Sequence, residues 1–550
     1  MPARSRRSTV KPLEVARSLG ADPDVAARYR ASGWWSERTL SDRVADLAAT
    51  RAEQAAWITP QGRFTWGAYD RAATRIAALI SARGLLPGAR VAVLLPDGPA
   101  VHAALLGVER AGMVAVGIGA RAGIAEIAHL LKRTGATLIL AHEAMRDCTL
   151  PELVAAVRAQ GAPLADWLVV PDLIAFRNWS AGETPDHPPF APGDPDTLFL
   201  INSTSGTTGM PKCVMHTQNR WFYFHQLAAQ AGRFGEDEIF MGAVPAPFGF
   251  GLWTSHFSPT ILGCPTVLLP KFDAGTALDM IERERVTVLC CVSTQFIMLL
   301  NEQAERPRDL SSLRSMFTGG EAVPYRRAAE FEDVTGAAVL QFYGSNETGA
   351  LSRTTASDTR DRRLNTAGRV IPEMEVRLFD PATGVEVEGR GQPGCRGPAT
   401  CLGYWDDDEA NAKLFTSDGW MLMGDIVEVD DEAYLRVVGR TSEFIIRGGK
   451  NLSAPAIEAE VATHPAVALV AAVAAPDAVF GERVCVYVSP RPNQQVTLEG
   501  ITAHLHARGV SREWFPEYLV LMDDLPRSSG GKVAKGELTA DAKKRWAVPA

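Results

Sequence analysis

Short apolar runs alternate with helix-like stretches between residues 90 and 141. The runs RVAVLL, MVAVGI and TLILA occupy residues 90–95, 113–118 and 137–141, and helix-like segments at 100–109 and 124–133 separate them. A continuous apolar run of this length is typical of a parallel strand that is buried on both faces. Regular alternation of such strands with helices predicts βαβ units, so this part of the chain is restricted to an α/β fold.

The same strand pattern returns later in the chain. The apolar runs TLFLI, VTVLCCV and VLQFY lie at 197–201, 286–292 and 339–343, and they extend the α/β part. From about Arg360 the strands become shorter, and turn signals such as PATG, GRGQPG and SDGW separate them. These shorter strands and frequent turns predict a smaller β-rich part.

A third part begins near Thr441, where the helix-like segments PAIEAEVATH and GITAHLHARG accompany the strand-like segments VALVAAVAA and RVCVYVSP. A chain of 550 residues is also longer than one hydrophobic core usually supports. We therefore expect an α/β protein with two domains. The larger, residues 1–440, contains α/β subdomains and a β-rich subdomain, and the smaller, residues 441–550, is a compact α+β unit.

Composition excludes several classes of function. The chain carries 56 basic and 64 acidic residues, a net charge of −8, which argues against a nucleic-acid partner. Its eight cysteines form no C-x-x-C pair and no Cys/His ligand spacing, so we interpret them as small buried side chains rather than as zinc ligands or disulfides. The longest uninterrupted apolar run, Ala466 to Ala475, is too short to cross a bilayer. We expect a cytoplasmic protein with no membrane partner.

One loop stands out as a site for chemistry because it follows the predicted strand at 197–201 directly. Glycines let backbone N–H groups approach an anion, hydroxyl groups add donors, and a lysine adds a positive charge, so such a loop can hold a polyphosphate. The alternative, a plain flexible Ser/Thr/Gly loop, is common, but chance seldom produces so many specified positions in a row. The candidate residues are Thr204, Ser205, Gly206, Thr207, Thr208, Gly209 and Lys212.

Two better-known nucleotide motifs do not account for this loop. The Walker A pattern G-x-x-x-x-G-K-[ST] occurs nowhere in the chain, which disfavours a P-loop NTPase. Gly389, Gly391 and Gly394 fit the pattern G-x-G-x-x-G, but Pro393 interrupts it and no helix is predicted to follow. We interpret that second segment as a turn.

The phosphate loop and the segments that follow it resemble the adenylate-forming superfamily, which contains acyl- and aryl-CoA synthetases, adenylation domains of peptide synthetases and luciferases. The resemblance covers nearly the whole chain, and the segments occur in the expected order. They are TSGTTGMPK (204–212), TGGEAVP (318–324), YGSNE (343–347), GDIVEVDDEAYLRVVGR (424–440), RGGKN (447–451) and LPRSSGGK (525–532).

The resemblance implies a reaction in two halves. A carboxylate attacks the α-phosphorus of ATP to give acyl-AMP and pyrophosphate, and a thiol, usually that of CoA, then displaces AMP. The loop 204–209 and Lys212 would hold the β- and γ-phosphates. Tyr343 would face the adenine, and Glu347 would bind Mg²⁺. The same resemblance assigns Gly320, Glu321, Gly344 and Asn346 to the nucleotide site.

Further residues follow from the later segments. Asp425 resembles the carboxylate that accepts hydrogen bonds from the ribose hydroxyls, with Arg440 beside it. Lys532 resembles the catalytic lysine that neutralises charge on the carboxylate and α-phosphate during adenylation. The C-terminal domain resembles a mobile domain that rotates between the half-reactions, here about Glu443. After rotation, Gly448 and Gly449 would leave room for the pantetheine arm of CoA.

Four positions depart from the usual pattern of the superfamily. Cys213 stands where Gly is common, Asn346 where Thr is common, and Met423 where Ser or Thr is common. Glu443 occupies the hinge position that is more often Asp or Lys. We expect Asn346 to matter most, because an amide and a hydroxyl differ in reach, and we expect some retuning of the acid pocket.

The identity of the acid depends on the residues that line its pocket. By resemblance these include His225, Phe248, Gly249 and Gly319, although His225 also fits an ordinary core or surface position. Gly249 lies near the place where relatives that activate amino acids often carry an Asp, and the surrounding AVPAPFGFGLW has no charged residue. These features favour a compact apolar acid, aromatic or alicyclic, over an amino acid.

We therefore interpret the chain as an ATP- and Mg²⁺-dependent carboxylic acid–CoA ligase that acts through acyl-AMP, as a monomer or homodimer. One alternative keeps adenylation but passes the acid to a carrier protein, an amine or another acceptor that is not CoA. A second alternative, from another class, is a catalytically silent nucleotide-binding protein.

Overall fold

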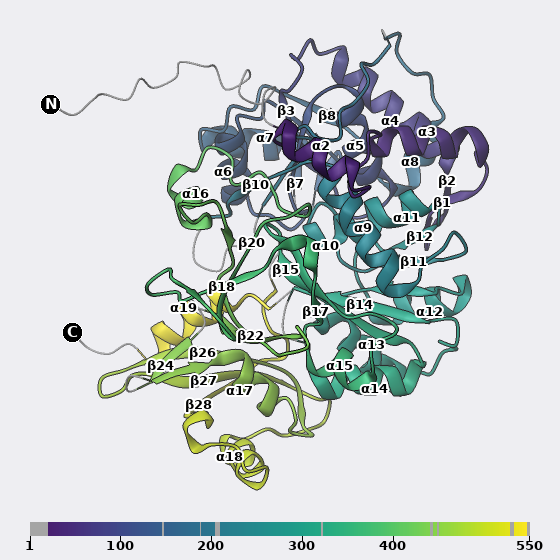
Figure 1. Ribbon diagram of the computed structural model, residues 1–550. Coiled ribbons are helices and arrows are strands. Elements are labelled where there is room, and N and C mark those ends of the chain that lie inside the picture. The colour runs from purple at the N-terminus through teal and green to yellow at the C-terminus, as the bar shows by residue number, and fades with distance from the viewer. Residues whose placement is uncertain are drawn as a thin grey trace, which may run out of the picture.

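A computed structural model describes residues 20–145, 148–187, 189–203, 210–320, 323–440, 444–447, 450–527 and 533–546. The strands form three large sheets in the N-terminal part of the chain and a fourth in the C-terminal part. Figure 1 shows β24 to β28 and α17 to α19 gathered at the end of the molecule opposite helices α2 to α5. The mixed α/β architecture, with a small α+β unit at the end of the chain, confirms the predicted fold class.

The first sheet has six strands in the order β10-β9-β4-β3-β5-β8. All neighbouring strands pair in parallel except β9 and β10. The apolar runs predicted at 90–95, 113–118 and 137–141 are β3, β4 and β5, and each is fully buried. The strands are β3 (Arg90–Leu94), β4 (Val114–Gly117), β5 (Leu138–Ala141), β8 (Asp166–Val169), β9 (Leu200–Ser203) and β10 (Cys213–His216). The helices of this region are α2 (Pro23–Ala31), α3 (Leu40–Thr50), α4 (Trp66–Ser81), α5 (Pro99–Arg110), α6 (Ile124–Thr134), α7 (Leu150–Ala159) and α8 (Leu173–Ser180), and a short pair β6 (Ala144–Met145) and β7 (Cys148–Thr149) precedes α7.

The second sheet has nine strands in the order β17-β16-β15-β14-β13-β11-β12-β1-β2. Its centre is parallel, and an N-terminal hairpin that the sequence pattern did not reveal extends one edge, where Trp57 of β1 pairs with Thr266 of β12. The strands are β1 (Ala55–Thr59), β2 (Gly62–Thr65), β11 (Phe240–Gly242), β12 (Thr266–Leu268), β13 (Val288–Cys290), β14 (Ser315–Gly319), β15 (Ala338–Ser345), β16 (Gly349–Arg353) and β17 (Arg369–Val370). The helices are α9 (Asn219–Gly232), α10 (Gly249–Gly251), the π-helix η1 (Leu252–Phe257), α11 (Ser258–Leu262), α12 (Ala274–Glu284), α13 (Ser293–Glu305), α14 (Tyr325–Thr335), α15 (Arg360–Asn365) and the 3₁₀-helix η2 (Pro372–Met374).

The β-rich part forms the third sheet and corrects one prediction. The G-x-G-x-x-G segment is not a turn but most of strand β20, because its glycines allow close packing: a Cβ on Gly391 would lie 2.8 Å from the carbonyl oxygen of Phe379, and one on Gly394 would lie 2.7 Å from the Phe379 ring. The strands are β18 (Arg377–Phe379), β19 (Glu386–Val387), β20 (Arg390–Cys395), β21 (Met421–Leu422), β22 (Asp425–Val429) and β23 (Leu435–Arg440), with helix α16 (Asp408–Leu414).

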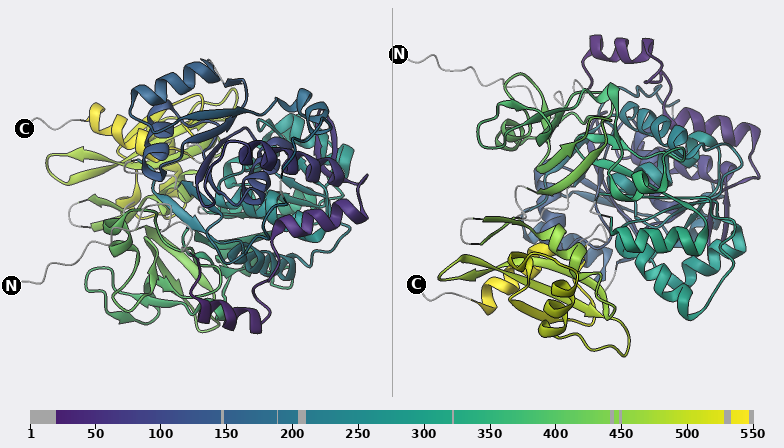
Figure 2. Two further views of the ribbon diagram at one scale, coloured as in Figure 1. Left: turned by 90° about the horizontal axis from the view of Figure 1, so that it is seen from above. Right: turned by 60° about the horizontal axis from the view of Figure 1, so that its bottom comes forward.

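The C-terminal sheet has the order β25-β24-β27-β26, and β28 pairs with β27. Figure 2 shows this part of the chain, in yellow-green and yellow, as a unit of sheet and helices. Its elements are β24 (Phe444–Arg447), β25 (Lys450–Ser453), α17 (Ala454–Val461), β26 (Val467–Asp477), β27 (Gly481–Pro490), α18 (Leu498–Ala507), the 3₁₀-helix η3 (Arg512–Trp514), β28 (Tyr518–Leu521) and α19 (Lys535–Arg545). Clusters around Ile457 and around Tyr487 provide this part with its own cores. Among the described residues, no helix is both long enough and apolar enough to span a membrane.

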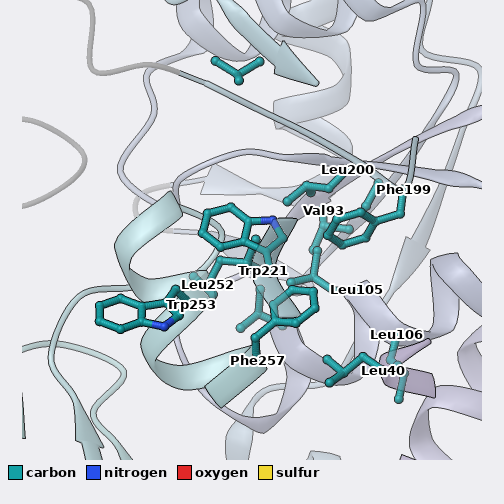
Figure 3. Packing of buried hydrophobic residues seen from close by; sticks show 14 of the residues in the cluster. Leu40, Val93, Leu105, Leu106, Phe199, Leu200, Trp221, Leu252, Trp253 and Phe257 are labelled. Carbon is teal, nitrogen blue, oxygen red and sulfur yellow. The ribbon is translucent and has the colours of Figure 1, made fainter. Parts of the chain in front are cut away.

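The largest core joins the first and second sheets and contains most of the aromatic residues near the candidate site. Trp221 of α9, Trp253 and Phe257 of η1 and Leu200 of β9 pack together within it (Figure 3). All eight cysteines are unpaired, and only Cys148 is not fully buried, as expected for small core side chains.

Candidate active site

Strand β9 leads into the loop predicted to hold phosphates. The strand continues through Asn202 to Ser203, beyond the predicted run, and Ser203 pairs with Cys213 at the start of β10. Ser203 and Cys213, the described residues on either side of the predicted phosphate-binding segment, are therefore neighbours in the first sheet. Since β9 is parallel to β4, Ser203 lies at the carboxyl end of a parallel strand, which is the edge where open α/β sheets bind their ligands.

Tyr404 joins two predicted catalytic residues that are far apart in the sequence. Its hydroxyl group donates a 2.7 Å hydrogen bond to Oε1 of Glu347, and the Nζ atom of Lys212 lies 4.7 Å from the centroid of its ring. The segment around Tyr404 runs beside β10, where the Trp405 N–H donates to the carbonyl oxygen of Cys213. The predicted metal ligand and the predicted phosphate-binding lysine thus contact the same side chain.

The buried guanidinium of Arg220 fixes the backbone next to Glu347. Nη1 donates to the carbonyl oxygen of Asn346 at 2.9 Å, Nη2 to that of Glu347 at 3.3 Å, and Nε to that of Ala399 at 2.8 Å. Burial lowers the pKa of this guanidinium to about 10, so it keeps its charge at neutral pH. Because a buried charge needs partners, Arg220 holds the loop after β15 in one arrangement.

The predicted ribose-binding residues also meet. Asp425 begins β22, is almost fully buried, and accepts a 2.9 Å hydrogen bond from the Tyr343 hydroxyl at the end of β15. Arg440 is the direct cross-strand partner of Asp425. Besides presenting an aromatic face, Tyr343 therefore orients the carboxylate that is predicted to bind the ribose.

The predicted acid-pocket residue Gly249 lies next to an amide group and to aromatic side chains. A Cβ on Gly249 would lie 2.6 Å from Oδ1 of Asn346 and 3.4 Å from the Trp221 ring. Phe250, just after Phe248, packs on Trp253, which in turn packs on Phe224 and Phe342 at centroid distances of 5.5, 4.6 and 5.1 Å, respectively.

Two glycines at the end of β14 continue this wall. The carbonyl oxygen of Phe342 would be 2.5 Å from a Cβ on Gly319, so this glycine is needed for strand packing. Gly320, the next residue, has φ +78°, a left-handed conformation that favours glycine. A Cβ on Gly344 would likewise overlap the carbonyl oxygen of Gly349, so backbone approach explains this glycine without a ligand.

His225 is buried on α9, with Nδ1 3.3 Å from the hydroxyl oxygen of Ser258. Burial lowers the pKa of its imidazole to about 4, so the ring is neutral at physiological pH. It shares a helix face with Trp221, four residues earlier, but it supplies no positive charge for a carboxylate.

Two of the departures from the superfamily pattern are core positions. Cys213 is buried in the core beside the first sheet, and burial raises the pKa of its thiol to about 12. Met423 is 5% exposed and belongs to the largest core. Asn346, in contrast, is half-buried and donates a 2.7 Å hydrogen bond to Oδ1 of Asn202.

Some predicted residues cannot be placed. The side chain of Arg440 and the hinge residue Glu443 lie outside the described part of the chain, as do the following candidates: Thr204, Ser205, Gly206, Thr207, Thr208, Gly209, Glu321, Gly448, Gly449 and Lys532.

Three residues of the site escaped the sequence analysis: Asn202, Arg220 and Tyr404. Arg220 carried a signal, because a cation within the apolar helix segment NRWFYF indicates a buried charge that needs partners. Asn202 and Tyr404 carried none, since their importance comes only from contacts with residues distant in the sequence.

A carboxylate and a lysine that meet near the carboxyl end of a parallel strand are typical of an α/β enzyme that binds a nucleotide. Residues 44–405 match the family of AMP-binding enzymes, and residues 456–532 match the AMP-binding enzyme C-terminal domain. The chain belongs to the AMP-binding enzyme family, which confirms the resemblance to the adenylate-forming superfamily.

Similar proteins cover nearly the whole chain. The medium-chain fatty-acid–CoA ligase of Escherichia coli (strain K12) is 28% identical over 536 residues, which are 94% of this chain and 93% of the relative. The salicyl-AMP ligase / salicyl-S-ArCP synthetase of Mycobacterium tuberculosis is 30% identical over 531 residues, 93% of this chain and 92% of the relative. The crystal structure of ATP-bound MatB from Rhodopseudomonas palustris aligns with a TM-score of 0.80 at 25% identity and covers 92% of this chain and 99% of MatB. The protein is an AMP-forming acid–thiol ligase that uses ATP and acts through an acyl-AMP intermediate.

Proposed function

We propose that this ligase joins a compact carboxylic acid with an aromatic or alicyclic body to CoA. The observation that carries the proposal is the convergence of Glu347 and Lys212 on Tyr404, beside the end of β9. A carboxylate and an ammonium group held at one place suit the triphosphate of ATP, whose charge must be neutralised as pyrophosphate leaves. The aromatic rings around Trp253 give the acid an apolar setting.

In this proposal the triphosphate lies against residues 204–209 and Lys212, and the ribose lies against Asp425, whose orientation the Tyr343 hydroxyl holds. Lys532 contributes the positive charge that adenylation needs at the carboxylate and α-phosphate. Its loss is expected to abolish adenylation and to spare thioester formation from supplied acyl-AMP. Equal loss of both half-reactions in Lys532→Ala would contradict this assignment.

Mg²⁺ fits the site as a companion of the nucleotide. Mg²⁺ is usually held by one or two carboxylates together with substrate phosphates, and Glu347 supplies one such carboxylate with a fixed backbone and an oriented Oε1. When bound, the ion would reduce the negative charge of the phosphates.

The acceptor separates the proposal from its nearest rival. The relatives include a CoA ligase at 28% identity and a synthetase named for an aryl carrier protein at 30% identity, so similarity favours neither acceptor. Gly448 and Gly449, which by resemblance leave space for a pantetheine arm, fit CoA and carrier phosphopantetheine equally well.

Pyrophosphate exchange tests the first half-reaction, and release of AMP tests the second. Purified protein should exchange labelled pyrophosphate into ATP only when a suitable acid from an aromatic, alicyclic and fatty-acid panel is present. AMP release that then requires CoA supports the ligase, whereas release only with a loaded carrier or an amine supports the rival. Absence of exchange with every acid would favour a catalytically silent nucleotide-binding protein.

A further inference from the structure

A polar group occupies the space that a side chain at position 249 would fill. Oδ1 of Asn346 lies 2.6 Å from the place of a Cβ on Gly249, beside the ring of Trp221. Phe250, which follows Gly249 in the chain, packs on Trp253. The amide of Asn346 therefore brings hydrogen-bonding capacity into a wall that the sequence alone predicts to be apolar.

A series of hydrogen bonds determines which atom of this amide faces Gly249. Arg220 can only donate, and its Nη1 lies 2.5 Å from Nδ1 of His216, so Nδ1 must accept. His216 is neutral, because burial and the adjacent Arg220 hold its pKa well below the ordinary value. A neutral imidazole whose Nδ1 accepts carries its proton on Nε2, and Nε2 lies 2.7 Å from Oδ1 of Asn202.

The orientation of the Asn202 amide determines the orientation of the Asn346 amide. Its Oδ1 accepts from His216, and its Nδ2 donates to the carbonyl oxygen of Pro247 at 3.1 Å, so its amide has one orientation. Nδ2 of Asn346 then donates to the same Oδ1 at 2.7 Å, and Oδ1 of Asn346 accepts a longer bond of 3.4 Å from Nδ2 of Asn202. The reverse orientation of Asn346 would place two acceptor oxygens against each other at that distance. The nitrogen of Asn346 therefore faces Asn202, and the oxygen faces Gly249.

We propose that Asn346 is a specificity-determining residue and that the acid substrate carries a hydrogen-bond donor, a hydroxyl or amino group, next to its carboxylate. This inference rests on the proposed function, because it assigns the Gly249 wall to the acid. The oxygen of Asn346 accepts the donor of the substrate, and the absence of a side chain at Gly249 leaves the space that this oxygen occupies. Asn202 is a positioning residue that keeps the acceptor directed at the substrate.

The substrate range follows from the chemistry of a fixed acceptor. An acid with a donor beside the carboxylate satisfies the Asn346 oxygen. An unsubstituted acid leaves that oxygen with only its long 3.4 Å bond from Nδ2 of Asn202, and an ether at the same position brings a second acceptor against it. Sites built to bind a hydroxyl group reject analogues that lack it far more strongly than apolar pockets reject a missing methylene. We expect at least about a tenfold preference in kcat/KM for the donor-bearing acid of each matched pair.

The experiment measures acid-dependent pyrophosphate exchange with matched acids. The panel contains benzoate with 2-hydroxy-, 2-amino- and 2-methoxybenzoate, and cyclohexanecarboxylate with 2-hydroxycyclohexanecarboxylate. Wild type should prefer the hydroxy and amino acids over both the unsubstituted and the methoxy acids. In Asn346→Ala the preference should fall to within about threefold, whatever the overall rate. Asn301→Ala is the control, because the Asn301 side chain also makes a short hydrogen bond, accepting from Nη2 of Arg327 at 2.6 Å, but lies on α13. Its preference should match wild type.

The outcomes separate this inference from the proposed function. Equal exchange with 2-hydroxy-, unsubstituted and 2-methoxy acids, or an unchanged preference in Asn346→Ala, overturns the inference and leaves the ligase assignment intact. Exchange with no acid of any kind overturns both. If Asn346→Ala does not fold, Gly249→Ala provides the same test, since its Cβ displaces the Asn346 oxygen and should lower the same preference.

Discussion

Removal of the Tyr404 hydroxyl group tests the arrangement on which the proposed function depends. Tyr404→Phe deletes the 2.7 Å hydrogen bond to Glu347 but keeps the ring beside Lys212. Glu347 is 9% exposed, so water does not readily replace the lost donor. A hydrogen bond to a charged group contributes about 1.5–3 kcal/mol, and loss of a partner that orients a metal ligand typically costs about 10- to 100-fold in metal affinity or activity.

The assay is pyrophosphate exchange over a series of Mg²⁺ concentrations, with thermal unfolding measured in parallel. Tyr404→Phe should raise the Mg²⁺ concentration for half-maximal exchange by about 10- to 100-fold. Tyr434→Phe is the matched control, because the Tyr434 hydroxyl donates an equally short 2.7 Å bond to Asp358 outside the candidate site. The control should lose stability without a change in Mg²⁺ dependence. An unaltered Mg²⁺ requirement in Tyr404→Phe would refute the role given to Glu347.

Three further changes have definite expectations. Arg220→Lys keeps the charge but cannot donate to all the carbonyl oxygens that the guanidinium contacts. Urea unfolding should show that the free energy of unfolding falls by about 3–5 kcal/mol, and a decrease below about 1 kcal/mol would contradict the buried network. Gly344→Ala places a Cβ on the carbonyl oxygen of Gly349 and should cost about 3 kcal/mol or more in the same measurement, whereas near-neutrality would show that β15 and β16 can separate. Burial raises the pKa of the Asp97 carboxyl to about 8 and lowers the pKa of the His102 imidazole to about 3. Below pH 6.5 the two groups change the free energy of unfolding in opposite directions. Between pH 6.5 and 8 only Asp97 binds a proton differently in the folded and unfolded chains. The folded chain holds the Asp97 proton in that window and the unfolded chain does not, so stability falls as pH rises, by up to about 2 kcal/mol. Asp97→Asn should remove that loss, and an unchanged pH dependence of unfolding would contradict it.

The sequence predicted the parallel strands that are continuous apolar runs, but it did not predict β8, β11, β12 or β14. Strands β3, β4 and β5 coincide with their predicted segments to within a residue or two. The sequence could not predict which strands pair with each other, since hydrophobic periodicity identifies a strand but not its neighbour in the sheet. The β1–β2 hairpin joins β12 through Trp57 and Thr266, and nothing local to either residue indicates that pairing.

For the site, too, the sequence identified individual residues but not the contacts between them. Motif order located Lys212, Glu347, Tyr343 and Asp425, and the structure brings them together in two pairs. Tyr404 links the first pair, yet its own surroundings in the sequence give it no distinguishing feature. The turn predicted at the Gly391 segment was wrong because glycine serves two purposes, and here close packing in a strand takes precedence over chain reversal.

The Arg220 network connects two parts of the site that would otherwise be independent. Its guanidinium binds the carbonyl oxygens of both Asn346 and Glu347, and through His216 it sets the orientation of Asn202. The amide that faces the acid wall and the carboxylate proposed to hold Mg²⁺ are consecutive residues with one shared anchor. Because neither backbone group can move without leaving a buried donor unpaired, the two groups keep a fixed separation. A substitution that displaces Asn346 should therefore also disturb Glu347, so loss of acid preference with intact Mg²⁺ dependence requires a change confined to the side chain, as in Asn346→Ala.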